Sequence, residues 1–158
     1  MKVCVAAVGR LKPGSGLAAA IRDYEDRLHR CFRFTTVEVA PAGLPDSQAE
    51  RARKEEGRAL ARGIPDELEL VALTRKGALW STDRLARYLQ DLGDRGRPGA
   101  AFAIGGAHGL SGEFMGRSTH RVSVSAMTLP HEMARLVLSE QLYRAAMIHR
   151  NHPYHKGK

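Results

Sequence analysis

The chain has 158 residues, of which 43% are hydrophobic and 27% charged, so it can bury one compact core and is not a disordered protein. No apolar run reaches the roughly 18 residues that a membrane-spanning helix requires. The formal net charge of +8 favours a polyanionic partner without choosing among RNA, DNA and a lipid surface. The two cysteines, Cys4 and Cys31, form no CxxC motif and indicate reduced, buried thiols in a cytosolic protein.

Short apolar segments alternate along the chain with segments of helical periodicity. The predicted strands cover residues 2–9, 34–40, 68–74, 100–106 and 121–127, and the predicted helices cover 15–32, 47–63, 81–93, 111–118 and 130–150. The first, third and fourth strands are continuously apolar, as in strands buried on both faces of a parallel sheet, whereas the other two alternate and belong nearer an edge. This order predicts an α/β fold with a mainly parallel five- to six-stranded sheet and flanking helices, in a single domain over residues 1–158.

The last predicted helix, residues 130–150, carries more apolar surface than one contact requires. Pro130 suits the first helical turn, with Thr128 or Leu129 as the cap. Apolar side chains cover well over half of the circumference, although a helix packed on a sheet needs a stripe of only about 100°. The surplus is covered either by loops or by a second copy of the chain, and we favour a homodimer interface.

A glycine-dense segment, AIGGAHGLSG at 103–112, follows the fourth strand. It is not a phosphate-binding P-loop, because GxxxxGK[ST] occurs nowhere in the chain. It fits a dinucleotide fingerprint poorly, since the order is Gly105-Gly106-x-x-Gly109 and the segment comes late in the sequence. A tight strand-to-helix turn without a ligand is the remaining alternative.

Several segments taken together resemble one known family. These are VAAVGRLK near the start, LVALTRKG in the middle, and IGGAHGLS, SAMTLPH, SEQLYRA and NHPYH in the second half. The combination resembles the RlmH family of SPOUT-class methyltransferases, which methylate N3 of a pseudouridine in large-subunit (23S) ribosomal RNA. The resemblance extends over the whole chain and implies a C-terminal trefoil knot, which the usual topology rules would not predict.

The same resemblance implies that the glycine loop binds S-adenosyl-L-methionine and not a phosphate. The implied cofactor contacts are Leu73, Gly106, Ser125, Ala126, Met127, Thr128, Leu129 and Pro130. Glycines without a β-carbon let the backbone approach the adenosine closely, and main-chain N–H and C=O groups can recognise the adenine edge. The family forms a homodimer in which the tail of one subunit completes the cofactor pocket of the other.

Methylation of pseudouridine N3 requires an imide to lose its proton as it attacks the methyl group, so the enzyme must align the methyl, stabilise charge and exclude water. We assign His155 as proton acceptor or substrate-positioning group, Tyr154 as a residue acting across the dimer interface, and Arg144 as the cation that stabilises the imide anion. Two alternatives stay open: Arg144 forms only an i,i+4 ion pair with Glu140, and His131 only packs.

Two further patterns have a functional and a plain interpretation. His149, His152 and His155 have a metal-like spacing, but Pro153 interrupts it and no acidic or thiolate ligand is near, so we expect no metal. In the helix at 47–63, four cations share one face: Arg51, Lys54, Arg58 and Arg62. They either contact RNA phosphates or form a solvated face relieved by Glu55 and Glu56.

The sequence therefore predicts a cytoplasmic, homodimeric, S-adenosyl-L-methionine-dependent methyltransferase acting on large-subunit ribosomal RNA in the assembled ribosome, without metal or membrane. The alternative function is a non-catalytic ribosome-binding or assembly factor of the same fold.

Overall fold

The computed structural model describes residues 1–155 and contains one five-stranded, all-parallel sheet in the order β2-β1-β4-β3-β5. The strands are β1 (Lys2–Val8), β2 (Arg33–Val39), β3 (Glu69–Leu79), β4 (Gly99–Ile104) and β5 (His120–Ser123). The helices are α1 (Gly16–His29), α2 (Ala49–Gly63), α3 (Thr82–Asp94), α4 (Gly112–Arg117) and α5 (His131–His149), with short 3₁₀ turns η1 (Asp46–Gln48) and η2 (Pro153–His155). The predicted α/β class is confirmed, and β2 and β5 are the edge strands, as their alternating patterns predicted.

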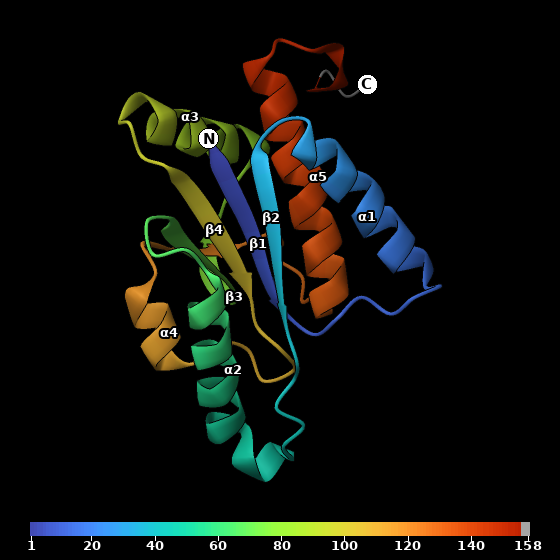
Figure 1. Cartoon of the computed structure of the whole chain (residues 1–158), viewed down its shortest axis with the longest axis vertical. Helices are drawn as coiled ribbons and strands as arrows, with labels where there is room; N and C mark the ends of the chain where they lie inside the picture. The colour runs from blue at the N-terminus through green and yellow to red at the C-terminus, as the bar shows by residue number, and fades with distance from the viewer. Residues whose placement is uncertain (156–158) are drawn as a thin grey trace.

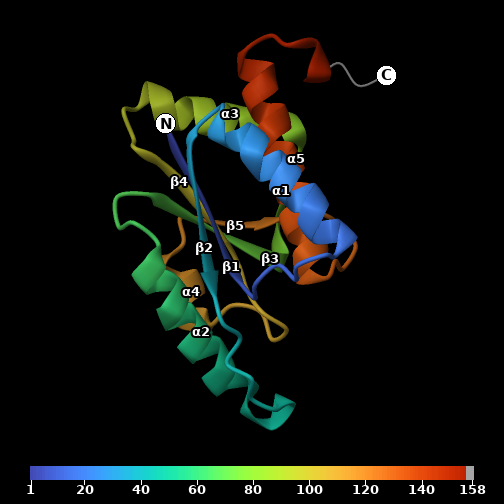
Figure 2. The ribbon, with the colours of Figure 1, turned by 45° about the vertical axis from the view of Figure 1, so that its right-hand side comes forward.

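Helices cover both faces of the sheet. Helices α1, α3 and α5 lie on one face, and α2 and α4 lie on the other (Figures 1 and 2). The chain places them there because β1 and β4 are buried along almost their whole length and present apolar side chains alternately to each face.

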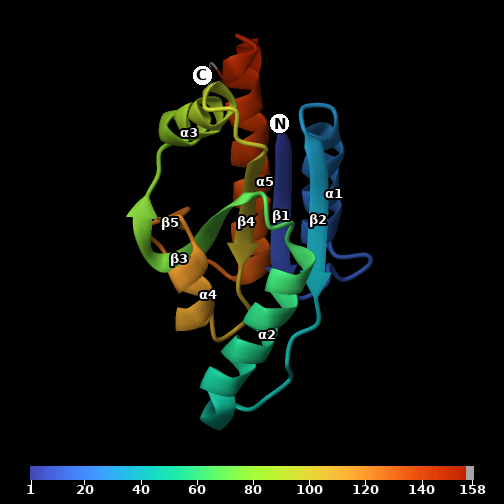
Figure 3. The same cartoon turned by 60° about the vertical axis from the view of Figure 1, so that its left-hand side comes forward.

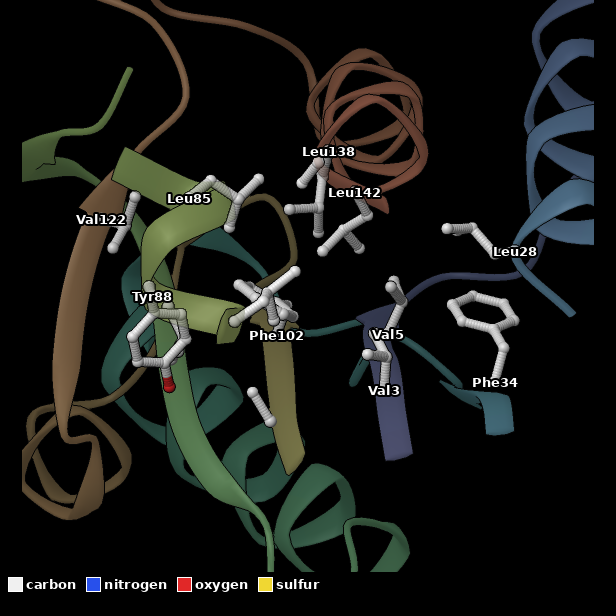
Figure 4. Packing of buried hydrophobic residues seen from close by; sticks show 14 of the residues in the cluster. Val3, Val5, Leu28, Phe34, Leu85, Tyr88, Phe102, Val122, Leu138 and Leu142 are labelled. Carbon is white, nitrogen blue, oxygen red and sulfur yellow. The ribbon is translucent and has the colours of Figure 1, made fainter. Parts of the chain in front are cut away.

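The two faces of the sheet are packed with side chains of different size. Towards α1, α3 and α5 the core holds large residues such as Val5, Phe34, Phe102 and Leu142 (Figure 4). Towards α2 and α4 the strands present small side chains such as Ala101, so these helices approach the sheet with few bulky partners. Cys4 belongs to this second cluster. The prediction that both cysteines are buried is wrong for Cys31, which is half-buried.

Strand β3 is longer than predicted and curves around β5. The prediction ended it at residue 74, but β3 continues to Leu79 after a bulge between Leu73 and Ala78, and both of these residues pair with Val122 of β5 (Figure 3). At Gly77 the strand passes so close to β5 that a β-carbon would lie 2.5 Å from the backbone carbon of Val122. Strand β5 is correspondingly short, and residues 124–130 form a loop instead of the predicted strand end.

Helix α5 begins at His131, one residue later than predicted, with Pro130 as its N-cap. The helix packs between α1 and α3 over the sheet (Figure 1), so these two helices, and not loops, cover much of its broad apolar surface. Its single buried cation, Arg135, is 3% exposed and donates to Glu25 of α1 at 2.7 Å and to Glu38 of β2 at 2.6 Å. Within residues 1–155, no helix combines the length and apolar character needed to cross a bilayer.

Candidate cofactor-binding and active site

Three segments meet where strands β4 and β5 end and β3 bulges. They are the bulge of β3 after Leu73, the glycine loop after β4, and the segment 124–130 between β5 and α5. Together with the first turn of α5 they enclose a cavity of about 590 Å³. The carboxyl ends of parallel strands are the usual ligand-binding edge of an open α/β sheet, because loops from neighbouring strands converge there.

Seven of the eight predicted cofactor contacts line this one cavity. They are Leu73, Gly106, Ser125, Met127, Thr128, Leu129 and Pro130. Ala126, the eighth, lies in the same loop but does not line the cavity. His131, which was not predicted as a cofactor contact, does line it. The structure thus brings together residues that are separated by more than fifty positions in the sequence.

The glycine loop is a closed turn held by its own backbone. Gly106 pairs with Gly109 in an isolated bridge, and the Gly109 N–H donates to the Gly106 carbonyl at 3.0 Å. Gly109 has φ of +78°, a conformation that only glycine adopts without strain. Ser111 then caps α4 by accepting from the Phe114 N–H at 3.1 Å. The predicted strand-to-helix turn is present, and it also forms one wall of the cavity.

Serine hydroxyls bend the second wall, the segment 124–130. The Ser123 hydroxyl donates to the Ser125 carbonyl at 2.7 Å, and the Ser125 hydroxyl accepts from the Met127 N–H at 2.9 Å. These side-chain bonds replace strand pairing after β5, so the main chain of this segment is available to a ligand. Met127 is 77% exposed, which is unusual for a large apolar side chain and marks the rim of the cavity.

The charged side chains in the lining are cationic. Arg53 of α2 and the pair Arg75 and Lys76 of the β3 bulge contribute to the wall, and no carboxylate lines the cavity in the part of the chain that the structure describes. Arg53 is held in place by Glu50, its neighbour on α2, and by the carbonyl of His108 in the glycine loop, at 3.5 Å.

Glu56 is a residue that the sequence reasoning placed wrongly. It was expected to relieve charge on the exposed face of α2, but it is only 6% exposed and lies beneath the glycine loop. One carboxylate oxygen accepts from the Ala42 N–H at 2.9 Å, and the other, Oε2, has no partner and would lie 2.9 Å from a β-carbon on Gly106. The buried i,i+4 stripe Ala52, Glu56, Leu60 was the signal that could have found it.

The lining suits a nucleoside-sized ligand with an amino-acid tail. The volume falls within the about 300–1,000 Å³ of small-molecule sites. Leu73, Ile104 and Leu129 supply apolar surface, and the two bent loops supply main-chain donors and acceptors. The cations of the β3 bulge match a ligand carboxylate. The residues present therefore fit S-adenosyl-L-methionine, as the resemblance implies.

Arg144 and Tyr154 lie far from this cavity within the same chain. Arg144 is ten residues beyond Ala134, the last α5 residue of the lining, which corresponds to about 15 Å along the helix. In Figure 1 the tail (red) lies at the end of α5 opposite to the glycine loop. The side chain of His155, the predicted proton acceptor, lies outside the part of the chain that the structure describes.

The tail is nonetheless fixed by a small polar cluster. Arg144 donates to Glu140 at 2.7 Å and to the Tyr154 carbonyl at 3.3 Å, and the Tyr154 hydroxyl donates to Glu140 at 3.2 Å and lies 3.3 Å from that of Tyr24 in α1. The hydrogen bond to Glu140 raises the pKa of Arg144, and burial, followed by the Tyr24 hydroxyl, raises the pKa of Tyr154. The i,i+4 ion pair between Arg144 and Glu140, which was the alternative to a catalytic role for Arg144, is present. The cluster also holds the tail against α5.

The C-terminal histidines and the basic face of α2, the two remaining sequence patterns, include residues that contact specific neighbours. His149 lies 2.8 Å from the Ala86 carbonyl. Among the side chains that the structure describes, which do not include that of His155, no group of three His, Cys, Asp or Glu residues is arranged to hold a metal ion. On α2, Arg51 pairs with Glu55 at 2.8 Å and Lys54 lies 3.8 Å from Glu50. The basic face of α2 is thus partly neutralised by its own helix.

Comparison with known proteins agrees with this geometry. A ribosomal RNA large subunit methyltransferase H from Clostridium kluyveri is 36% identical over 160 residues, covering 99% of this chain and 100% of that protein. A protein of the same name from Gemmatimonas aurantiaca is 39% identical over 156 residues, with the same coverage. The crystal structure of TrmJ from Z. mobilis ZM4 matches with a TM-score of 0.53 at 14% identity, covering 90% of this chain and 69% of that one, which shows a shared fold.

The fold and the relatives define the class of the protein as an α/β methyltransferase. A family model described as a predicted SPOUT methyltransferase matches residues 1–155, and the chain belongs to that family. The sequence-based resemblance and the enzyme class are therefore confirmed, whereas the trefoil knot stays a prediction.

Proposed function

We propose that this protein methylates N3 of a pseudouridine in large-subunit ribosomal RNA, with S-adenosyl-L-methionine as the methyl donor. It acts on the assembled ribosome in the cytoplasm, as a homodimer in which each subunit is a single SPOUT domain. The observation that carries the proposal is the single cavity lined by seven of the eight expected cofactor residues. The names of the relatives and the net charge of +8 support an RNA substrate.

The side chains and loops of this protein have distinct tasks in that reaction. The bound donor supplies an electrophilic methyl group on a sulfonium centre. The bent segment 124–130 and the glycine loop orient the donor, because their main-chain groups are fixed before it binds. Arg144 stabilises negative charge on the imide, and His155 accepts the N3 proton, while Tyr154 positions the tail that carries it.

The separation of tail and cavity favours a site shared between two subunits. Arg144 and Tyr154 lie at one end of α5, and the cavity lies at the other end. Two copies of α5 packed antiparallel would bring the tail of each subunit to the cavity of its partner. Met133, which is 38% exposed on the first half of α5, is an apolar side chain available for such packing.

Mixed dimers test the shared site. We expect a cavity variant, Gly105→Ala, and a tail variant, Arg144→Ala, each to lose methyl transfer to ribosomes. Unfolding and refolding the two together forms dimers in which one site has both defects and the other has none. Activity should then return to about a quarter of wild type if the tail acts across the interface. A site contained within one chain would give no recovery.

Two measurements separate this function from the alternatives. Calorimetric titration with S-adenosylhomocysteine should show binding, and its absence would favour a non-catalytic ribosome-binding factor. Mass spectrometry of ribosomal RNA from a deletion strain should reveal one missing methyl group on a pseudouridine. A loss from another base or from transfer RNA would correct the substrate while leaving the enzyme class unchanged.

A further inference from the structure

A second hollow lies on the other side of β5, between α3 and the edge of the sheet. It has a volume of about 560 Å³ and is lined by Trp80, Arg84, Arg87, Tyr88, Asp91, Arg95 and His120. We call it the α3 groove. It shares no lining residue with the proposed cofactor cavity.

Three arginines line the α3 groove against one carboxylate, Asp91. Within residues 1–155, neither Arg84 nor Arg87 nor Arg95 forms an ion pair with an acidic side chain, and Arg95 donates instead to the Asp91 backbone carbonyl at 3.1 Å. This differs from α2, where the acids of the helix neutralise part of the basic face. Guanidinium groups without carboxylate partners in a hollow are available to bind phosphates.

Aromatic rings form the floor of the groove. Trp80, Tyr88 and His120 contact one another with ring centroids 5.0 to 5.3 Å apart, and the Arg84 guanidinium lies 5.1 Å above the Trp80 ring. Tyr88 is fixed from behind by Glu69, which accepts its hydroxyl at 3.4 Å. An unpaired base can stack on such a guanidinium plane, as occurs when proteins bind single-stranded RNA. The Trp80 indole N–H has no hydrogen-bond partner, so the floor is not a fully satisfied structural cluster.

One short strand connects the α3 groove with the cofactor cavity. His120 begins β5 and lines the groove, whereas Ser123 ends β5 and lines the cavity. Three strand steps separate His120 from Ser123, which corresponds to about 10 Å. A strand of RNA whose target base enters the cavity can therefore reach the groove with the nucleotides next to that base.

The geometry points to the α3 groove as the binding site for unpaired RNA that flanks the methylated nucleotide, with Arg84 and Arg87 on its phosphates and the Arg84–Trp80 stack against a base. This inference rests on the proposed function for the identity of the RNA. The arginines and rings themselves determine the chemical class of the partner.

Tryptophan fluorescence tests the site directly, because Trp80 is the only tryptophan in the chain. Wild-type protein is titrated with a single-stranded RNA oligonucleotide of mixed sequence. We expect saturable quenching of Trp80 emission that weakens with added salt. Binding that leaves the emission unchanged would overturn the proposal, and so would equally strong quenching by vesicles of anionic lipid.

Charge reversal tests the arginines. Arg84→Glu with Arg87→Glu should weaken RNA binding about tenfold or more and reduce the slope of log K against log salt by about 1.4, as expected for two lost phosphate contacts. For a matched control, Arg87→Glu alone is compared with Arg33→Glu, which makes the same charge change at an exposed position on β2, the opposite edge of the sheet. If the two single variants lose RNA affinity equally, the arginines of the groove act only through the overall positive charge of the protein, and the proposed site is overturned.

Methyl transfer to ribosomes separates failure of this inference from failure of the proposed function. The double variant should bind S-adenosylhomocysteine like wild type and show a raised KM for ribosomes. If wild type methylates ribosomes and the double variant does so with unchanged KM, the groove is refuted and the function stands. If wild type methylates no ribosomal RNA but its RNA binding still depends on Arg84 and Arg87, the function is refuted and the groove stands.

Discussion

Replacing Gly105 by alanine should strongly weaken cofactor binding with little effect on the rest of the fold. A β-carbon at this position would lie 2.6 Å from the backbone carbon of Gly109 and 2.9 Å from the Leu110 nitrogen. Carbon atoms in contact are normally about 3.5–4.0 Å apart. Because the obstructing atoms belong to the backbone, no side-chain rotation can remove the clash, and the glycine loop must open by about 1 Å.

The magnitude follows from that displacement. A misplacement of about 1 Å in a binding or catalytic group costs on the order of 100-fold. Overpacking a tight site costs about 1–3 kcal/mol in stability, which a domain of this size can tolerate. We therefore expect S-adenosylhomocysteine affinity to fall about 100-fold while the protein remains folded.

Isothermal titration calorimetry measures the affinity, and circular dichroism with urea unfolding measures the fold. Gly112→Ala is the matched control, because a β-carbon there meets no atom within 4 Å and the residue lies in the first turn of α4, just after the same loop. Gly105→Ala binding with wild-type affinity, or Gly112→Ala losing it equally, would refute the proposed role of the closed turn.

Three further outcomes are expected. Arg135→Met should lower the free energy of unfolding by about 1–3 kcal/mol at neutral pH, since it leaves the half-buried Glu25 and the more exposed Glu38 without their cation; an unchanged urea midpoint would contradict this. Burial already raises the pKa of Glu25, so its ionised form opposes folding; the Arg135→Met defect should shrink as pH falls towards the ordinary carboxyl range, and a pH-independent defect would count against it. Ser139→Ala should raise the free energy of unfolding by about 1 kcal/mol, because the fully buried Ser139 hydroxyl has no hydrogen-bond partner. Urea unfolding measures this, and a lower free energy of unfolding in the variant would contradict it.

Hydrophobic patterning was sufficient to predict the sheet. Continuous apolar runs located the buried strands β1 and β4, and alternation located the edge strands, because burial on one or both faces imposes those patterns directly. Patterning could not predict that β3 continues past Thr74. The residues after it, Arg75 to Gly77, are charged or small, and only the close passage of β5 gives them a place in the sheet.

The site was accessible from the sequence only in part. The resemblance named residues that the fold then gathered around one cavity, since loops at one sheet edge converge whatever their distance along the chain. Glu56 was missed because a glutamate among many charged neighbours looks solvent-exposed, and only its spacing from Ala52 and Leu60 marks it as buried. The α3 groove was missed although six of its seven lining residues lie between Trp80 and Arg95, because in sequence their polar members resemble the solvated face of an amphipathic helix. Only the fold adds His120 from β5 and shows that Trp80, Tyr88 and His120 contact one another.

The polar cluster of Arg144, Glu140 and Tyr154 has a consequence for how readily a shared site could form. Ordering a free peptide arm costs about 1–2 kcal/mol for each residue of backbone. Here that entropy is lost when the single chain folds, since the arm is already anchored to its own helix. A subunit that docks would therefore present an already ordered tail. The affinity between the two subunits would then not be lowered by the conformational entropy lost on ordering that tail.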